Sequence, residues 1–449
     1  MESIEDQKRR IIDVFRSFGI ECSQLSYNIG STVIFYEFTP KIGSRLSRLK
    51  NYMDDITLSL GGSARIVLPV PGRGTIGIEM PHDHPQTVLF SSIMDSADFQ
   101  NLNYPLPIIL GKNGMNENCV IDLVKQPHLL IAGSQGFGKT VFLRTIIYSL
   151  LHKKQSNELR FVLMAEEVNT LHINNSIIEK YLAEFSDHKK AIITDVCQAI
   201  RTLESLCVEM NNRFDLLRTL KCRSIDECHQ FPYIVVIIDE YANFLMSAGN
   251  EFLSPLCHLA QLGRTVGIHL VITTKRTVPN IISGTIKAHF QARIAFRTCC
   301  TMDSYTIIDR QGAESLLRPG DMLFDDGMEL IRLQGAFVDK EYQQNIVQLD
   351  LSEPYILPSG DSWHLGYEEI EETEEEDMDS LDPLFEDVAR FIMQLGKCSH
   401  AIISESFSIS NVRTAKIMRQ LENAGIIEYK VDYLTDKELR DIMENDLMK

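Results

Sequence analysis

Lys139 and Thr140 close a glycine-rich stretch whose residue types and spacing predict chemistry directly. The stretch has the form G-x-x-x-x-G-K-[ST], beginning at Gly133, which is the pattern of a phosphate-binding loop. Glycines there let the backbone turn tightly and direct several N–H groups at phosphate oxygens. We expect Lys139 to contact the β- and γ-phosphates of a nucleotide and the Thr140 hydroxyl to bind Mg²⁺.

The residues around this loop fit the same interpretation. Residues 128–132 predict a short buried strand, and residues from 141 onward predict an amphipathic helix that adds its positive N-terminal end. The alternative, a glycine-rich turn before an ordinary helix, is weakened by this strand–loop–helix order. The residues expected to surround the nucleotide are Gly133, Ser134, Gln135, Gly136, Phe137, Gly138, Lys139, Thr140 and Val141.

Two carboxylates provide the second half of the predicted site. Residues 233–238 form an unbroken apolar run, which is typical of a parallel strand buried on both faces, and Asp239 and Glu240 follow it directly. Ligands bind at this carboxyl end of strands in open α/β sheets. We expect Asp239 to hold Mg²⁺ and Glu240 to orient and deprotonate an attacking water. These motifs together predict a nucleotide triphosphatase that uses Mg²⁺.

Composition limits the class of protein. The 449 residues carry a formal net charge of −18, but nine of the negative charges lie in one run, residues 368–379, so the total charge does not exclude a DNA-binding surface elsewhere. The ten cysteines include no C-x-x-C pair, which favours reduced thiols. No apolar run has the length of a membrane span, and the N-terminus lacks a signal-peptide pattern. We therefore expect a cytoplasmic protein.

The order of predicted elements divides the chain into four parts. Residues 1–107 predict a small α+β module, and residues 108–350 predict an α/β domain with a mainly parallel sheet and helices on both faces. Residues 351–381 carry the acidic run and predict a flexible linker, although an acidic lure for a basic partner is an open alternative. Residues 382–449 predict a helical DNA-binding domain with a short helical tail. The expected strands of the α/β domain are 128–132, 160–164, 233–238, 268–274 and 292–296, and its expected long helices are 192–220 and 251–264.

The last domain contains one helix with two different faces. In residues 411–424, steps of about 100° place apolar side chains on one arc and Arg413, Lys416 and Arg419 on the opposite side. The third helix of a helix–turn–helix fold presents such a face to a major groove. Three cations are by themselves a weak signal, because a solvated helix face has the same composition.

Several stretches together resemble the FtsK/SpoIIIE family of double-stranded DNA translocases. The resemblance lies in the phosphate loop with its strand, in Ile238-Asp-Glu-Tyr-Ala242, and most densely in Gly267-Ile-His-Leu-Val-Ile-Thr-Thr274. It continues through Pro319-Gly-Asp-Met-Leu-Phe324, and Asp382-Pro-Leu384 with Ala424-Gly-Ile-Ile427 resembles the family's C-terminal winged-helix domain.

This resemblance implies a RecA-like motor that forms a homo-hexameric ring around duplex DNA and couples ATP hydrolysis to translocation. It also implies a winged helix that recognises DNA sequence, and a role in chromosome or plasmid segregation. Arg264 resembles the family's arginine finger, which reaches the γ-phosphate held by a neighbouring subunit. Lys287 resembles a second basic position near the inter-subunit site. A surface arginine at a helix end is the alternative for Arg264.

The sequence also departs from the family pattern. Lys275 stands where the family usually has a phosphate-sensing Gln, and an ammonium group cannot accept a hydrogen bond from water. Ala165-Glu166-Glu167 stands in place of Asp-Pro-Lys, so one cation is lost and two carboxylates are gained. These changes motivate one alternative, a nucleotide-switched DNA-binding scaffold that hydrolyses little ATP. A related conjugation- or secretion-type pump with another cargo is a second open alternative.

Overall fold

The computed structural model describes most of the first 358 residues and a few positions beyond them. The described residues are 3–41, 52–61, 64–68, 70, 74–168, 171, 173, 178–184, 192–228, 231–339, 342–343, 355–358, 384–385, 388–391, 417 and 421. Contacts divide the chain into two compact units, residues 1–367 and 368–449. Arg413, Lys416 and Arg419 lie outside the described residues, as does the acidic run, so the winged helix and the linker stay predictions.

The N-terminal part forms a module with its own core. Its elements are α1 (Ile4–Ser17), β1 (Cys22–Ile29), β2 (Val33–Pro40), α3 (Met53–Ser59), β3 (Arg65–Val67) and β4 (Ile76–Pro81). The strands form an antiparallel sheet in the order β1-β2-β4-β3. Ser3 begins α1 with a capping box in which its side chain and that of Asp6 satisfy each other's backbone N–H groups. Phe15 then packs edge-on against Phe38 of the sheet, with 5.1 Å between ring centroids.

The larger part of this unit is built on a nine-stranded sheet. Its strand order is β6-β5-β14-β13-β12-β7-β11-β10-β8. The strands are β5 (Pro107–Asn113), β6 (Asn118–Asp122), β7 (His128–Ala132), β8 (Leu159–Met164), β10 (Tyr233–Ile238), β11 (Ile268–Thr274), β12 (Ala292–Phe296), β13 (Asp321–Asp325) and β14 (Leu330–Gly335). The five strands from β12 to β8 are parallel, whereas the pairs from β12 to β6 are antiparallel. The expected mainly parallel sheet is therefore wrong for half of the strand pairs: the sheet is mixed.

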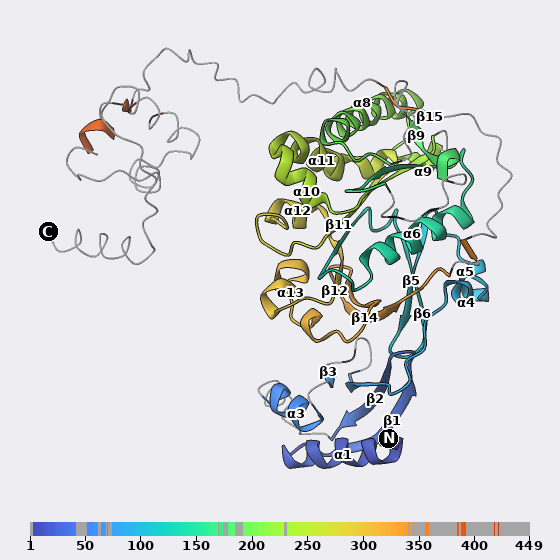
Figure 1. Cartoon of the computed structure of the whole chain (residues 1–449), viewed down its shortest axis with the longest axis vertical. Helices are drawn as coiled ribbons and strands as arrows, with labels where there is room; N and C mark the ends of the chain where they lie inside the picture. Colours follow the sequence, from blue (N-terminus) through green and yellow to red (C-terminus); the bar gives the residue numbers. More distant parts are fainter. Residues whose placement is uncertain are drawn as a thin grey trace. The chain divides into compact units, whose positions relative to one another are not determined.

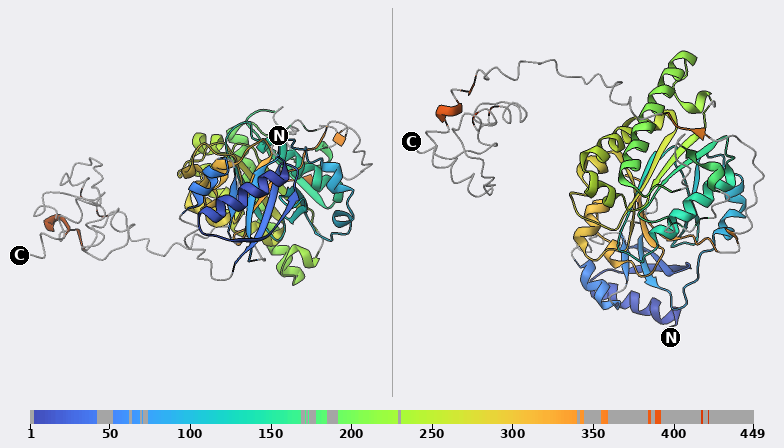
Figure 2. Two further views of the ribbon diagram at one scale, coloured as in Figure 1. Left: turned by 90° about the horizontal axis from the view of Figure 1, so that it is seen from below. Right: turned by 45° about the horizontal axis from the view of Figure 1, so that its top comes forward.

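Helices cover both faces of this sheet (Figures 1 and 2). One face packs in a common core with α4 (Phe90–Met94), α5 (Ala97–Gln100) and α6 (Lys139–Lys153). The other face packs against α8 (Val196–Leu220), α10 (Tyr241–Ala248), α11 (Asn250–Leu262), α12 (Gly284–His289) and α13 (Thr301–Ile308). Every residue of β7, β8, β10 and β11 is buried, as expected for strands covered on both sides.

Short elements complete the described part of the chain. They are η1 (Glu179–Tyr181), β9 (Ala183–Glu184), α9 (Ile225–Cys228), η2 (Gly263–Val266), η3 (Ala313–Ser315) and β15 (Tyr355–Ile356), of which β15 pairs with β9. The long helix expected at 192–220 begins at Val196, because Asp195 caps it by accepting a bond from the Gln198 N–H. None of the helices in the described ranges is long and apolar enough to cross a bilayer.

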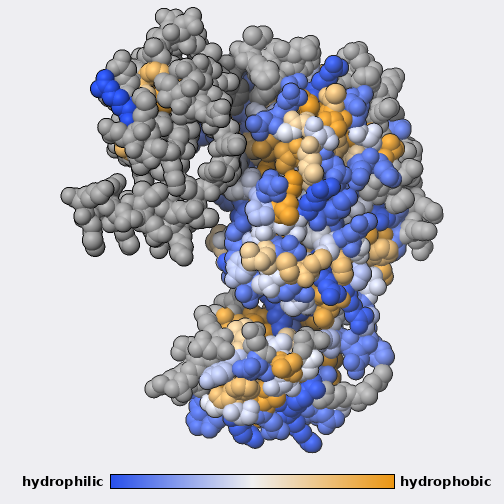
Figure 3. All heavy atoms as spheres, turned by 60° about the vertical axis from the view of Figure 1, so that its left-hand side comes forward, coloured by the Kyte–Doolittle hydropathy of each residue, from blue (hydrophilic) through white to orange (hydrophobic). Residues whose placement is uncertain are grey.

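A buried ion network joins the module to the large sheet. The surface narrows between the two parts (Figure 3). Arg332 of β14 lies at this junction, because it contacts a residue of the module. Its guanidinium donates to Glu79 of β4 at 2.8 Å and to both oxygens of Asp321 at 2.9 and 2.6 Å. Arg65 of β3 lies 3.3 Å from Glu79. Burial alone would raise the pKa of Glu79, but Arg65 and Arg332 hold that pKa below its ordinary value.

Candidate nucleotide-binding site

The phosphate loop lies between β7 and α6 in a conformation that requires glycine. Gly133 has φ +143°, and a Cβ atom there would lie 2.7 Å from the Phe296 carbonyl oxygen of the neighbouring strand β12. Gly138 has φ +111° and precedes Lys139, the first residue of α6. Positive φ angles of this size are unfavourable for residues with a Cβ atom. The loop therefore brings its N–H groups and the N-terminus of α6 to one place, which is the arrangement that binds phosphate.

Lys139 is buried and its ammonium group closes the loop. Its Nζ donates to the carbonyl oxygens of Gly133 at 2.7 Å and Ser134 at 2.9 Å. Burial lowers the pKa of Lys139, and the charges of Glu240 and Asp239 oppose that shift. The ammonium group is thus held at the loop, near two carboxylates, by bonds to backbone carbonyls that a phosphate group can replace.

Asp239 and Glu240 lie at the carboxyl end of β10, next to the ends of β11 and β8. The Thr273 hydroxyl of β11 donates to Asp239 Oδ1 at 2.6 Å and accepts from the Glu240 N–H at 3.0 Å. Burial raises the pKa of Asp239, whereas the Thr273 bond and the Lys139 charge act in the opposite direction. One hydroxyl therefore fixes both residues of the predicted pair.

The backbone of Glu240 is strained and its side chain is held in place. Its φ is +55°, a left-handed conformation that costs free energy for a residue with a side chain. The carboxylate accepts from the Thr274 hydroxyl at 2.9 Å through Oε1 and from the Lys275 N–H at 2.8 Å through Oε2. These bonds orient the carboxylate beside Asp239, as a residue that positions water requires.

The two departures from the family pattern meet at this edge of the sheet. The ammonium group of Lys275, which follows β11, lies 3.4 Å from Glu166 Oε2, which follows β8. Ala165 is buried, while Glu166 and Glu167 are exposed. The gained carboxylate and the gained cation are therefore partners of each other.

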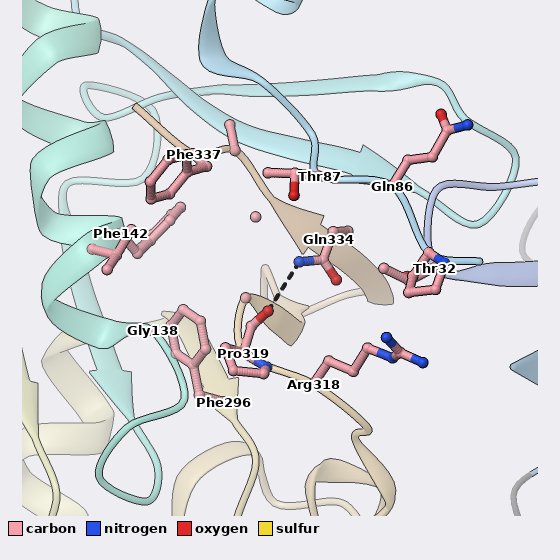
Figure 4. Close-up of a pocket in the computed structure, with 15 residues that line it drawn as sticks. Thr32, Gln86, Thr87, Gly138, Phe142, Phe296, Arg318, Pro319, Gln334 and Phe337 are labelled. Carbon is pink, nitrogen blue, oxygen red and sulfur yellow. Dashed lines mark hydrogen bonds between the residues drawn. The ribbon is translucent and has the colours of Figure 1, made fainter. Parts of the chain in front are cut away.

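A pocket of about 430 Å³ has Gly138 among the residues that line it. Figure 4 shows Phe142, Phe296 and Phe337 on one side of it and Thr32, Gln86 and Arg318 on another, with Gln334 donating to the Pro319 carbonyl oxygen at 3.1 Å. The lining combines a largely apolar wall with a few polar groups, which is the usual character of a small-molecule site. Because the α6 N-terminus forms part of its wall, the pocket continues the phosphate loop.

The residues expected to hold Mg²⁺ have suitable chemistry. Asp239 is a buried carboxylate, and Thr140 supplies a hydroxyl at the first turn of α6; such hard oxygen ligands suit Mg²⁺. In the described part of the chain, no group of three or more His, Cys, Asp or Glu side chains forms a metal site. A metal held here would take its remaining ligands from phosphate and water, as is usual for Mg²⁺.

The structure does not bring Arg264 or Lys287 to this site. Arg264 is exposed in the 3₁₀ turn η2 that precedes β11, whereas the phosphate loop follows β7, which runs parallel to β11. Arg264 is therefore at the opposite end of these strands from Lys139. Lys287 of α12 lies 2.5 Å from Asp309, which also binds Arg293 at 2.5 Å.

Thr273 and Thr274 belong to the site, but the sequence analysis did not predict a role for their hydroxyl groups. Both side chains are buried at the end of β11 and both bind the carboxylate pair. The available signal was the position of two hydroxyl residues at the carboxyl end of an otherwise apolar strand.

Comparison with known proteins gives the family. The FtsK alpha domain matches residues 1–82, and the FtsK/SpoIIIE family matches residues 90–231 and 226–279. The chain is 32% identical to the DNA translocase FtsK of Haemophilus influenzae, over 95% of this chain and 86% of that protein. The chain belongs to the FtsK/SpoIIIE family.

Other FtsK/SpoIIIE relatives are longer than this chain. It is 35% identical to the DNA translocase FtsK of Caldanaerobacter subterraneus and 32% identical to that of Chlorobaculum tepidum. The matches cover 95% and 94% of this chain but 60% and 55% of those proteins. The chain thus spans little more than half the length of these two relatives.

Solved structures support the fold of this FtsK/SpoIIIE chain. It matches the pCW3 conjugation coupling protein TcpA, determined with ATPγS, at a TM-score of 0.51 and 21% identity, over 75% of this chain and 96% of that one. It matches the cytoplasmic domain of the type VII secretion ATPase EccC of Thermomonospora curvata at 0.52 and 21% identity, over 61% of this chain and 36% of that one. The fold is that of a P-loop ATPase.

Proposed function

We propose that this chain is an ATP-driven translocase of double-stranded DNA. The observation that carries the proposal is the arrangement of Lys139, Asp239 and Glu240 at one edge of the sheet, in a chain of the FtsK/SpoIIIE family. Family membership supports duplex DNA as the substrate, and the geometry supports hydrolysis of a nucleoside triphosphate.

In this proposal each site residue has one task in hydrolysis. The N–H groups of the loop and the Lys139 ammonium group bind the β- and γ-phosphates, for which Lys139 exchanges its bonds to Gly133 and Ser134. Glu240, held by Thr274 and Lys275, orients a water molecule toward the γ-phosphorus and accepts its proton. Thr140 and Asp239 would hold Mg²⁺, which would supply charge neutralisation at the phosphate oxygens.

We place the base and ribose of the nucleotide in the pocket beside Gly138. A purine ring is flat and apolar on its faces, and it suits a wall that contains Phe142, Phe296 and Phe337. Arg318 and Gln334 supply polar groups for its edges. The pocket also includes Thr32 and Gln86 from the N-terminal part, so both parts of the unit would contact the nucleotide.

The position of Arg264 supports a proposal for the assembly. An arginine at the far end of the strands cannot reach its own chain's γ-phosphate, but it is exposed and available to a neighbouring subunit. We propose that Arg264 serves the site of the next subunit in a homo-hexameric ring, as an arginine finger supplied in trans. Arg413, Lys416 and Arg419 would contact DNA from a winged helix in residues 382–449, for transport in chromosome or plasmid segregation.

The experiment is ATP hydrolysis by the purified protein with long duplex DNA, with single-stranded DNA at equal nucleotide concentration, and without DNA. Strong stimulation by duplex that is lost in Lys139→Ala supports the translocase, and triplex displacement then tests movement. Lys153→Ala, at the other end of α6, is the control substitution. Equal stimulation by single strands would favour a conjugation- or secretion-type pump. ATP binding with little hydrolysis would favour the scaffold alternative.

A further inference from the structure

The ion pair between Lys275 and Glu166 connects the ends of β11 and β8, the two strands on either side of β10. In the sheet, β10 lies between β11 and β8; Lys275 follows β11, Glu166 follows β8, and their charged atoms are 3.4 Å apart. The pair therefore lies at the same sheet edge as Asp239 and Glu240. Lys275 has a second bond there, because its backbone N–H donates to Glu240 Oε2 at 2.8 Å.

This ion pair is weak. The side chain of Lys275 is 35% exposed and that of Glu166 is 56% exposed, so water screens both charges. Such pairs change a folding equilibrium by about fivefold at most. By contrast, a γ-phosphate brings two or more negative charges, and charge-assisted bonds to phosphate are considerably stronger. An anion of that kind can therefore displace Glu166 from Lys275 at little cost.

The ammonium group is also within electrostatic range of the phosphate-binding residues. Burial is the largest cause of the lowered pKa of Lys139 and of the raised pKa of Asp239. The charge of Lys275 lowers both pKa values, and the charge of Glu166 raises the pKa of Asp239. The Lys139 ammonium group and the Lys275 ammonium group thus act on the same region from two different strands. A triphosphate bound by Lys139 extends toward Asp239 and Glu240, where Lys275 lies.

We propose that Lys275 is a γ-phosphate sensor with Glu166 as its competing partner. This inference rests on the proposed function. Without nucleotide, or with a diphosphate, the ammonium group of Lys275 binds Glu166. When a triphosphate is present, that group binds the γ-phosphate while its backbone N–H keeps Glu240 in position. Glu166 therefore lowers the affinity for triphosphates and leaves the affinity for diphosphates unchanged.

The alternative is a surface ion pair without any part in nucleotide binding. It predicts that loss of either partner changes unfolding slightly and leaves nucleotide affinities as they are. The two interpretations differ in the ratio of triphosphate to diphosphate affinity, which a purely structural pair does not affect.

The test is equilibrium binding of ATPγS and ADP, each with Mg²⁺, to the full chain without DNA. Glu166→Gln should tighten ATPγS binding severalfold and leave ADP binding unchanged. Lys275→Met, which removes the charge and the donor, should weaken ATPγS binding by about tenfold, the size of one charge-assisted bond, with ADP again unchanged. In the double variant, Glu166→Gln should add nothing to Lys275→Met, because the two residues act as one unit.

Glu167→Gln is the matched control, since Glu167 is also exposed and adjacent in sequence but is not paired with Lys275 in the structure. It should leave both affinities unchanged. Equal effects of Glu166→Gln on ATPγS and ADP, or the same effect from Glu167→Gln, would overturn the inference. The wild-type chain could bind both nucleotides and hydrolyse ATP with duplex DNA while Glu166→Gln left the ratio of ATPγS to ADP affinity unchanged. In that case only the inference would fail. If the wild-type chain bound neither, the proposed function would fail with it.

Discussion

The two ends of strands β7 and β11 differ in whether their ionisable groups are charged or neutral. At their carboxyl ends, and at that of the neighbouring strand β10, lie Lys139, Asp239, Glu240 and Lys275, which are bonded to groups that a ligand can replace. Near the amino ends lie two histidines, His128 and His269, which are buried side by side with 6.4 Å between ring centroids. The same strands therefore carry an ionic end and a neutral end.

The neutral end is held by specific hydrogen bonds. Nδ1 of His128 accepts from the Leu270 N–H at 3.0 Å, and Nδ1 of His269 lies 3.0 Å from the Pro127 carbonyl oxygen, to which it must donate. Burial, followed by the neighbouring His269, lowers the pKa of His128 to about 3, and burial lowers that of His269 to about 4. Both rings are therefore neutral in the folded protein at pH 7.

The fold buries charged groups at the carboxyl ends of these strands and neutral groups near their amino ends. Charged groups at the carboxyl end are partly uncompensated, which leaves them able to bind phosphate and metal. The histidines contribute packing and backbone bonds, and their protonation would only destabilise the sheet. Substitutions at the first end should therefore change catalysis more than stability, and changes at the second end should do the reverse.

The largest expected effect is at Glu240. Glu240→Gln keeps the shape and an oxygen that accepts from Thr274, but it removes the base and the acceptor of the Lys275 N–H, so the hydrolysis rate should fall by about 10²–10⁴-fold. The unfolding free energy should fall by about 1 kcal/mol, the size of the one lost hydrogen bond. Steady-state hydrolysis and urea unfolding measure the two quantities, with Glu251→Gln on the exposed start of α11 as control. Retention of the wild-type rate would exclude Glu240 as the base.

A smaller effect is expected from the Thr273 hydroxyl. Thr273→Val keeps the shape of the side chain but removes its bonds to Asp239 and to the Glu240 N–H. We expect about a tenfold loss in hydrolysis and a loss of about 1–2 kcal/mol in unfolding free energy, because two buried groups lose a partner. The matched control is Thr306→Val, whose exposed hydroxyl bonds only within α13 in the described structure. An unchanged rate would show that the carboxylates keep their geometry without this hydroxyl.

At the histidine end we expect a pH effect on stability. Below pH 6.5 the unfolded chain binds protons at His128 and His269 that the folded chain does not, so unfolding free energy decreases as pH falls toward 4. Each residue contributes at most about 1.4 kcal/mol per pH unit. Urea unfolding at pH 7.5, 6.5 and 5.5 measures this decrease.

His269→Asn retains a donor for Pro127 and should reduce the pH dependence by about one proton, at the cost of lower stability at pH 7.5. ATPγS affinity at pH 7.5 should stay the same. His84→Asn, at an exposed position, should leave the pH dependence as it is. If His269→Asn kept the full pH dependence, the neutral buried state of His269 would be wrong.

The parallel strands and the phosphate loop could be predicted from the sequence because each is a local pattern. The apolar runs of β7, β8, β10 and β11 are found where they were expected, and the carboxylates follow β10. The antiparallel half of the sheet was not expected. Its strands β13 and β14 contain Asp321 and Arg332, whose charges interrupt an apolar pattern and are paired with each other and, for Arg332, with Glu79. Nothing local in the sequence indicates such a pairing.

The Lys275–Glu166 pair was hidden for the same reason. In sequence the two residues are two separate departures from a family pattern, each of which weakens the predicted activity. The structure brings them together across β10, where one change offsets the other. The helix expected at 251–264 also ends earlier, at Leu262, because Gly263 begins a 3₁₀ turn, and this places Arg264 outside the helix.

The ion network at the junction couples the sequence of the N-terminal module to the sequence of the nine-stranded sheet. Arg332 is buried with Asp321 from its own sheet and Glu79 from the module. A chimera that took its module from a relative with an apolar residue at position 79 would leave Arg332 with Asp321 alone and would take from Arg65 its partner Glu79. Unpaired buried charges typically cost about 3–5 kcal/mol. A module can therefore be exchanged between relatives only if the residues at positions 79 and 332 are exchanged together, although the two sheets share no strand.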